Sequence, residues 1–126
     1  MNFFDDGRAW NWVDENNVVL GYDYQEDCCE RPGWFMSEHP GHYDPCGWDD
    51  NGQVRNLDWS RYRFDPDYYA SADDLTCLDA GGAVSFRLVG DGVPDQYLYL
   101  YNAHNGYYGH GFTLSIGGQT MREETL

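Results

Sequence analysis

The chain has 126 residues, a length typical of one domain, and its 22 acidic residues against seven arginines and no lysine give a formal net charge of −15. Nucleic acids and anionic membranes are bound through clusters of lysine and arginine, so this charge argues against both as direct partners. It favours a basic protein as partner, for example one that itself binds nucleic acid. Aromatic residues make up 17% of the chain and can fill a core, which argues against disorder and predicts a single domain over residues 1–126.

The composition also indicates a host and a compartment. Abundant aspartate without lysine is typical of a GC-rich or halophilic host. The N-terminus lacks the basic and apolar segments of a signal peptide, and no apolar run approaches the roughly 20 residues that cross a bilayer. These features predict a cytoplasmic protein with reduced cysteines and leave its oligomeric state open.

The N-terminal quarter predicts a first β-hairpin. Val18–Tyr24 is rich in the β-branched and aromatic residues that favour strands, and Asp14–Asn17 before it has the composition of a turn. Trp10 and Trp12 are two positions apart, so a strand would place both on one face. We therefore predict a hairpin from about residue 8 to residue 24.

The middle of the chain is less regular. Residues 25–56 are rich in Gly, Pro, Asp and Asn, which predicts an irregular insert with a short strand at Trp34–Met36. Long irregular segments in small domains are often functional. The loose alternation of Asn56–Phe64 predicts another strand, and Ser71 followed by acidic residues fits the start of a short helix over 71–78.

The C-terminal third predicts three strands, Ala83–Val89, Gln96–Asn102 and Gly111–Ile116. The Asn105–Gly106 pair between the last two is a strong hairpin signal. The fold class that follows is mainly β: an antiparallel meander that forms a small sandwich or a curved sheet, with the one short helix near 71–78.

A row of tyrosines is the first candidate site. On a strand, Tyr97, Tyr99 and Tyr101 share one face, with leucines on the other. Tyrosine anchors many interfaces, so an exposed row would bind a ligand or partner; the alternative is a buried face of the sandwich. The candidate binding residues are this row and the turn that follows it: Tyr97, Tyr99, Tyr101, His104, Asn105, Tyr107, Tyr108 and His110.

The thiols and imidazoles are a second candidate. His39, His42 and Cys46 have compact, ligand-like spacing, and this donor set would select zinc. The alternative is that the cysteines pack as small apolar residues while the histidines lie in polar loops. The candidate zinc ligands are Cys28, Cys29, His39, His42 and Cys46.

Catalysis is a third reading. Cys28 or Cys29 with His104 or His110 would form a nucleophile and base, as in a small hydrolase or nucleotide-handling enzyme. No local sequence signature accompanies these residues, and acidic surroundings raise the pKa of a thiol. We therefore expect a non-enzymatic binding protein, and keep the zinc-stabilised domain and the Cys/His enzyme as alternatives.

Two segments resemble a known family. Residues 21–30 contain Gly-Tyr-Asp and, after four residues, Cys-Cys-Glu; residues 101–110 read Tyr-Asn-Ala-His-Asn-Gly-Tyr-Tyr-Gly-His. Together they are similar to motifs in a family of small proteins from bacteria and their phages. The resemblance implies a phage or prophage accessory protein in the host cytoplasm and implies no reaction. If the first and last predicted strands are neighbours, the corner at Cys28, Cys29 and Glu30 and the hairpin from His104 to His110 lie close together.

Overall fold

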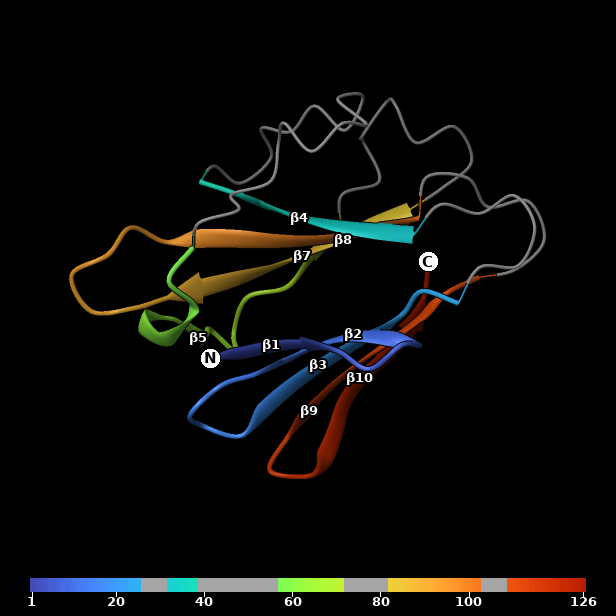
Figure 1. Cartoon of the computed structure of the whole chain (residues 1–126), viewed down its shortest axis with the longest axis horizontal. Coiled ribbons are helices and arrows are strands. Elements are labelled where there is room, and N and C mark those ends of the chain that lie inside the picture. The colour runs from blue at the N-terminus through green and yellow to red at the C-terminus, as the bar shows by residue number, and fades with distance from the viewer. Residues whose placement is uncertain (26–31, 39–56, 72–81, 103–108) are drawn as a thin grey trace.

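The protein is a sandwich of two antiparallel β-sheets, seen as two layers in Figure 1. The computed structural model describes residues 1–25, 32–38, 57–71, 82–102 and 109–126. The first sheet has the order β1 (Asn2–Asp5), β2 (Ala9–Val13), β3 (Val18–Asp23), β9 (Gly111–Ile116) and β10 (Gln119–Thr125). The second has the order β4 (Pro32–Ser37), β8 (Gln96–Asn102), β7 (Gly82–Val89) and β5 (Arg63–Phe64), with β6 (Ala70–Ser71) also paired to β7.

The predicted fold class is confirmed, and so are most of the predicted strands. The hairpin over residues 8–24 is β2 and β3, the short strand at Trp34–Met36 lies inside β4, and the three C-terminal strands are β7, β8 and β9. The sequence prediction missed the two edge strands of the first sheet. Both edges are polar and largely exposed, so neither shows the apolar alternation of a half-buried strand.

The prediction of a hairpin between β8 and β9 is wrong. These strands lie in different sheets, because β8 pairs with β4 and β7 while β9 pairs with β3 and β10. Residues 103–108, which include the Asn105–Gly106 signal, lie outside the described part of the chain. The connection therefore crosses from the second sheet to the first, although its composition is that of a tight turn.

The predicted strand over Asn56–Phe64 is wrong in most of its length. Trp59–Arg61 form a short 3₁₀ helix, η2, and only Arg63–Phe64 pair as a strand. Asp58 explains the difference, since its carboxylate accepts the backbone N–H of Ser60 at 3.2 Å and its hydroxyl at 2.5 Å. Such local bonds replace those of a β-ladder. Among the described residues, no helix is long and apolar enough to cross a membrane.

The predicted helix over 71–78 is mostly beyond the described ranges. Ser71 ends β6, where it pairs with Val84, and residues 72–78 are not among those the structure describes.

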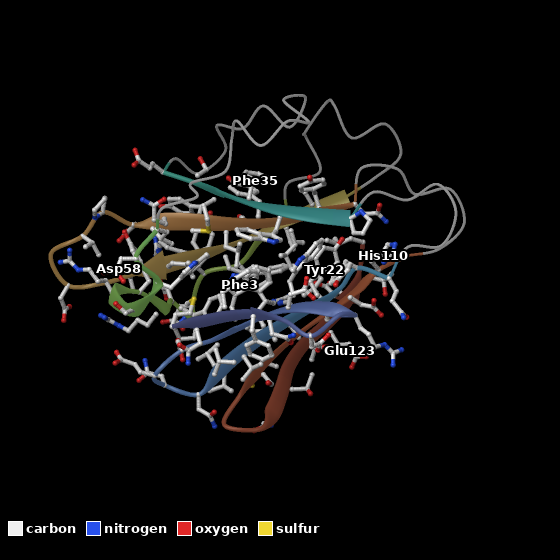
Figure 2. All side chains as sticks on the ribbon, viewed as in Figure 1. Phe3, Tyr22, Phe35, Asp58, His110 and Glu123 are labelled. Atoms are coloured by element: carbon white, nitrogen blue, oxygen red, sulfur yellow. The ribbon has the colours of Figure 1, made fainter. Side chains whose placement is uncertain are left out.

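The main core fills the space between the sheets. It is built from the alternate residues of each strand that point inward, and Figure 2 shows Phe3 and Tyr22 in this layer. Trp10 and Trp12 both contact it, as their spacing predicts. The fully buried members are mostly large: Trp12, Leu20, Tyr22, Met36, Leu88, Leu98 and Leu100. Aromatic residues share this interior with aliphatic ones, since six of the fourteen buried core members among the described residues are aromatic: Trp12, Tyr22, Tyr62, Phe64, Phe86 and Phe112.

Aspartates build the turns of this sandwich. Six of those in the described ranges accept a hydrogen bond, 2.8–3.2 Å long, on Oδ1 from the backbone N–H two residues later. This is an Asx turn, which places the side-chain oxygen where a backbone carbonyl would lie. The residues are Asp5, Asp6, Asp14, Asp23, Asp58 and Asp65. Part of the chain's acidity therefore serves local structure.

Asp14 also joins the two sheets. It is buried, and its Oδ1 accepts the N–H groups of Asn16 and Val18 at 2.9 Å each. Its Oδ2 accepts the N–H of Phe64, in β5 of the second sheet, at 2.9 Å. One carboxylate thus closes the β2–β3 turn and fixes the edge of the opposite sheet.

Candidate functional site

The structure brings the described parts of the two family-like segments together. Tyr22 donates its hydroxyl hydrogen bond to the carbonyl oxygen of Tyr101 at 2.8 Å, across the sandwich. His110 Nδ1 lies 3.1 Å from the carbonyl oxygen of Asp23. The second contact arises because β3 and β9 are neighbours, so that the end of β3 lies beside the start of β9, where Figure 2 labels His110. Cys28, Cys29, Glu30 and residues 104–108 lie outside the described ranges, so the expected proximity of that corner and that hairpin stays a prediction.

This junction is tightly packed and contains buried polar atoms that have no hydrogen-bond partner among the described residues. Asn102 Nδ2 and the backbone N–H of His110 both donate to the carbonyl oxygen of Leu126, at 3.1 and 3.0 Å. Both side chains are buried, and no described group hydrogen-bonds His110 Nε2 or Asn102 Oδ1. Burial also raises the pKa of the Tyr22 hydroxyl far above its usual value. The junction therefore links the two sheets, and one polar atom in each of the two buried side chains has no hydrogen-bond partner among the described residues.

The tyrosine row lies on the outer face of the second sheet, in a separate apolar cluster. Tyr97 is 8% exposed and Tyr99 is 2% exposed, and the Tyr99 ring stacks on Phe35 with centroids 4.5 Å apart. Figure 2 shows Phe35 on the side of β4 away from the first sheet. Their burial does not fit an open platform and agrees with the alternative of a packed face. That face is the outer one, because the leucines of β8 fill the space between the sheets.

Tyr101 completes the row in a different way. Its ring lies directly over Gly33, the residue opposite it on β4, and leaves no room for a Cβ there. It is half-buried, and burial raises the pKa of its hydroxyl. A larger residue at this strand position would therefore displace the Tyr101 ring.

Most other candidate residues lie outside the described ranges. These are His104, Asn105, Tyr107 and Tyr108 of the turn, and Cys28, Cys29, His39, His42 and Cys46 of the zinc set. Within the described ranges, no group of three or more His, Cys, Asp or Glu side chains is placed to hold a metal ion. The zinc site and the Cys/His nucleophile stay predictions.

The outer face of the first sheet is a surface that the sequence reasoning did not single out. Its side chains are those that alternate with the core residues, and the strand register aligns them in two rows across all five strands. One row is Asn2, Val13, Val19, Ser115 and Thr120; the other is Phe4, Asn11, Gly21, Thr113 and Glu123. Nine of these ten positions carry no charge, although the chain has a net charge of −15.

This surface, which we call the outer face of the first sheet, is accessible. Phe4 is 49% exposed, and the central residues, among them Val13, Val19 and Ser115, are half-buried. No described element lies over it in Figure 1. The sequence signal is the scarcity of charge at the alternate, non-core positions of 9–13, 18–23 and 111–116, where Asp23 is the one charged residue.

Acidic residues gather at one end of this face. Asp5 and Asp6 lie in the β1–β2 turn, and Asp23, at the end of β3, pairs with Ala9 of β2. The hydroxyl of Tyr24 donates to Asp5 at 2.7 Å, and the Tyr24 ring stacks on Trp10 with centroids 4.3 Å apart. Backbone N–H groups hold the pKa of Asp6 below its usual value, so its charge is fixed in place at neutral pH.

No family model, curated protein or solved structure matches this chain.

Proposed function

We propose that the protein is a non-enzymatic binding protein, a phage or prophage accessory, whose outer face of the first sheet docks onto a basic protein. The observation that carries the proposal is an accessible five-stranded face almost without charge on a chain of net charge −15. A face kept only for solvation would carry its share of the chain's 22 acidic residues.

The chemistry of the face suits an interface. Interface centres are depleted in charged residues, because charges lose their hydration when they are covered. Small side chains such as Val19, Gly21 and Ser115 leave the centre flat, and Phe4 at the β1 edge supplies an aromatic anchor.

The charge distribution favours a basic partner. Asp5, Asp6 and Asp23 border one end of the face, and their turn hydrogen bonds fix the carboxylates before any partner arrives. Complementary potentials of this kind steer association and weaken with salt. A second copy of the chain would carry the same charge of −15 and would be repelled.

The test adds charge to the centre of the face. Ser115→Glu places a carboxylate in the middle of one row, and Ser71→Glu, at an exposed position of β6, is the matched control. A basic protein is first captured from a lysate of the source organism, then purified, and its binding is measured by calorimetry at low and high salt. We expect Ser115→Glu to weaken binding at least about tenfold, Ser71→Glu to leave it unchanged, and salt to weaken it.

Three results would overturn the proposal. One is a partner that binds the wild type and Ser115→Glu equally. Another is self-association through this face, seen as a dimer that Ser115→Glu dissociates. The third is robust turnover by the homogeneous protein on a substrate panel.

A further inference from the structure

A polar cavity of about 260 Å³ lies apart from the outer face of the first sheet. It forms where the β2–β3 turn, η2 with the residues after it, and the β7–β8 turn meet. Its lining residues are Glu15, Ser60, Arg61, Tyr62, Arg63 and Asp91. The volume is just below that of typical drug-sized pockets, so it suits a small ligand.

The two arginines of this cavity are held only loosely. Arg61 Nη2 lies 3.4 Å from the carbonyl oxygen of Asp91, and Arg63 Nη2 lies 3.8 Å from the fully exposed Asp91 carboxylate. Arg87 shows what a committed pair looks like in the same chain, since both its Nε, at 2.9 Å, and its Nη2 donate to Asp65. Planar guanidinium groups bind carboxylates and phosphates well, and here two adjacent ones keep that capacity.

The other polar side chains of the lining either donate hydrogen bonds within the chain or are carboxylates. The hydroxyl of Ser60 donates to Asp58, and that of Tyr62 donates to the carbonyl oxygen of Pro94 at 3.0 Å. Neither hydroxyl has a proton left for a ligand. The selectivity of the cavity therefore rests on two guanidinium groups and the carboxylates of Glu15 and Asp91.

We propose that this cavity binds a small zwitterion of the amino-acid type. Its carboxylate would lie on Arg61 and Arg63, and its ammonium group would face Glu15 and Asp91. Two positive and two negative side chains line the cavity, so a ligand with both charges matches the lining, whereas the net charge of −15 disfavours a simple anion. A simple cation would leave the guanidinium groups without a partner.

The test is a titration of the isotope-labelled chain followed by NMR. The probes are glycine and longer ω-amino acids, with acetate, inorganic phosphate and ethylammonium as the single-charge comparisons. We expect one zwitterion to shift the amide signals of residues 60–63 and to bind at least about tenfold more tightly than any single-charge probe.

Two variants and a control separate the roles of the charges. Arg63→Gln is expected to weaken zwitterion binding at least about tenfold. Glu15→Gln is expected to move the preference toward acetate, because it removes the group that repels an anion. Arg8→Gln, which changes an exposed arginine elsewhere, leaves binding unchanged.

The proposal is overturned if no zwitterion shifts these signals up to about 10 mM, if a single-charge probe binds equally well, or if Arg63→Gln and Glu15→Gln bind like the wild type. Thermal melting of each variant confirms that the fold is intact. The cavity and the protein-docking face share no residue, so either proposal can fail alone.

Discussion

The two outer faces of the sandwich are built on opposite principles. The outer face of the second sheet carries large rings, with Phe35 and Tyr99 stacked and only 2% exposed each. The outer face of the first sheet carries small, half-buried side chains such as Val19 and Ser115. The same two-residue period generates both faces. The two faces differ in exposure whatever the side-chain size, since the small Ser85 beside Tyr99 is also only 2% exposed while the large Phe4 on the first sheet is 49% exposed.

The two outer faces also differ in how their charged residues are held. The second sheet's outer face includes Arg87, but this residue is paired with Asp65 and its guanidinium carbon lies 4.9 Å from the centre of the Tyr68 ring. The two rows that cross the first sheet's outer face hold one charged residue, Glu123 on the edge strand, and Asp23 lies at the end of the face. A paired charge can be partly covered, whereas an unpaired one at an interface centre is costly.

The largest effect should come from truncating a stacked ring. Phe35→Ala removes a buried aromatic side chain and is expected to lower the free energy of unfolding by about 3–5 kcal/mol. Val19→Ala, on the opposite outer face, is expected to cost about 1 kcal/mol or less. Urea unfolding measures both, and an equal cost would break the distinction between the two faces.

The next largest effect should come from Asp14, whose carboxylate connects the two sheets. Asp14→Ala leaves the backbone N–H groups of Asn16, Val18 and Phe64 without their acceptor, and is expected to cost about 1–3 kcal/mol. Asp14→Asn keeps one acceptor oxygen but turns an amide toward the N–H of Phe64, so it should remain destabilised. A wild-type stability for Asp14→Asn in chemical unfolding would show that the bond to β5 contributes nothing.

The charge pair on the second sheet's outer face should have a pH signature. Arg87 holds the pKa of Asp65 below its usual value in the folded state. The pair therefore stabilises the fold fully above the unfolded pKa of about 4, and this contribution is lost as the pH falls through the lower, folded pKa. Arg87→Gln is expected to cost about 1 kcal/mol at neutral pH.

The pH dependence of stability in the acid range distinguishes the charge interaction of this pair from a packing contact. The stability gap between the wild type and Arg87→Gln should close when Asp65 is protonated, as followed by thermal melting across the acid range. A gap that stays constant with pH would assign the effect to the contact with Tyr68 instead. Asp65→Asn is the matched background, in which the pH dependence of the gap should disappear.

The smallest effect is expected on the outer face of the first sheet. Ser115→Glu should change the free energy of unfolding by about 0.5 kcal/mol or less, because the position is accessible and no described contact depends on its hydroxyl. Urea unfolding of the isolated chain measures it. A large loss of stability would show that this face packs against something within the chain, and the docking interpretation would then fail.

The sequence predicted the strands of the sandwich better than its functional surface. Val18–Tyr24 and Gln96–Asn102 are correct within a residue because β-branched, aromatic and other apolar side chains are concentrated there. The strand at Asn56–Phe64 failed because Asp58 captures the local backbone first. The outer face of the first sheet was missed because its signal is a scarcity of charge spread over five strands, which becomes visible only once the register aligns them.

The aspartate content shows how one composition carries two meanings. From the sequence, the aspartate content predicted a basic protein as partner and a GC-rich or halophilic host. In the structure, Asp5, Asp23 and Asp65 each accept a backbone N–H two residues on, so their position is also a requirement of the turn. The turns fix where the negative charge lies.

The sequence by itself determined which side chains share a face, because alternation along a strand is a local property of the backbone. It placed Tyr97 and Tyr99 opposite Leu98 and Leu100, and the structure agrees. Only the tertiary structure decided which strands become neighbours, and it placed β9 beside β3 rather than β8. Backbone hydrogen bonds between strands are nearly the same for every sequence, so the choice of neighbour depends on how the inward faces pack together.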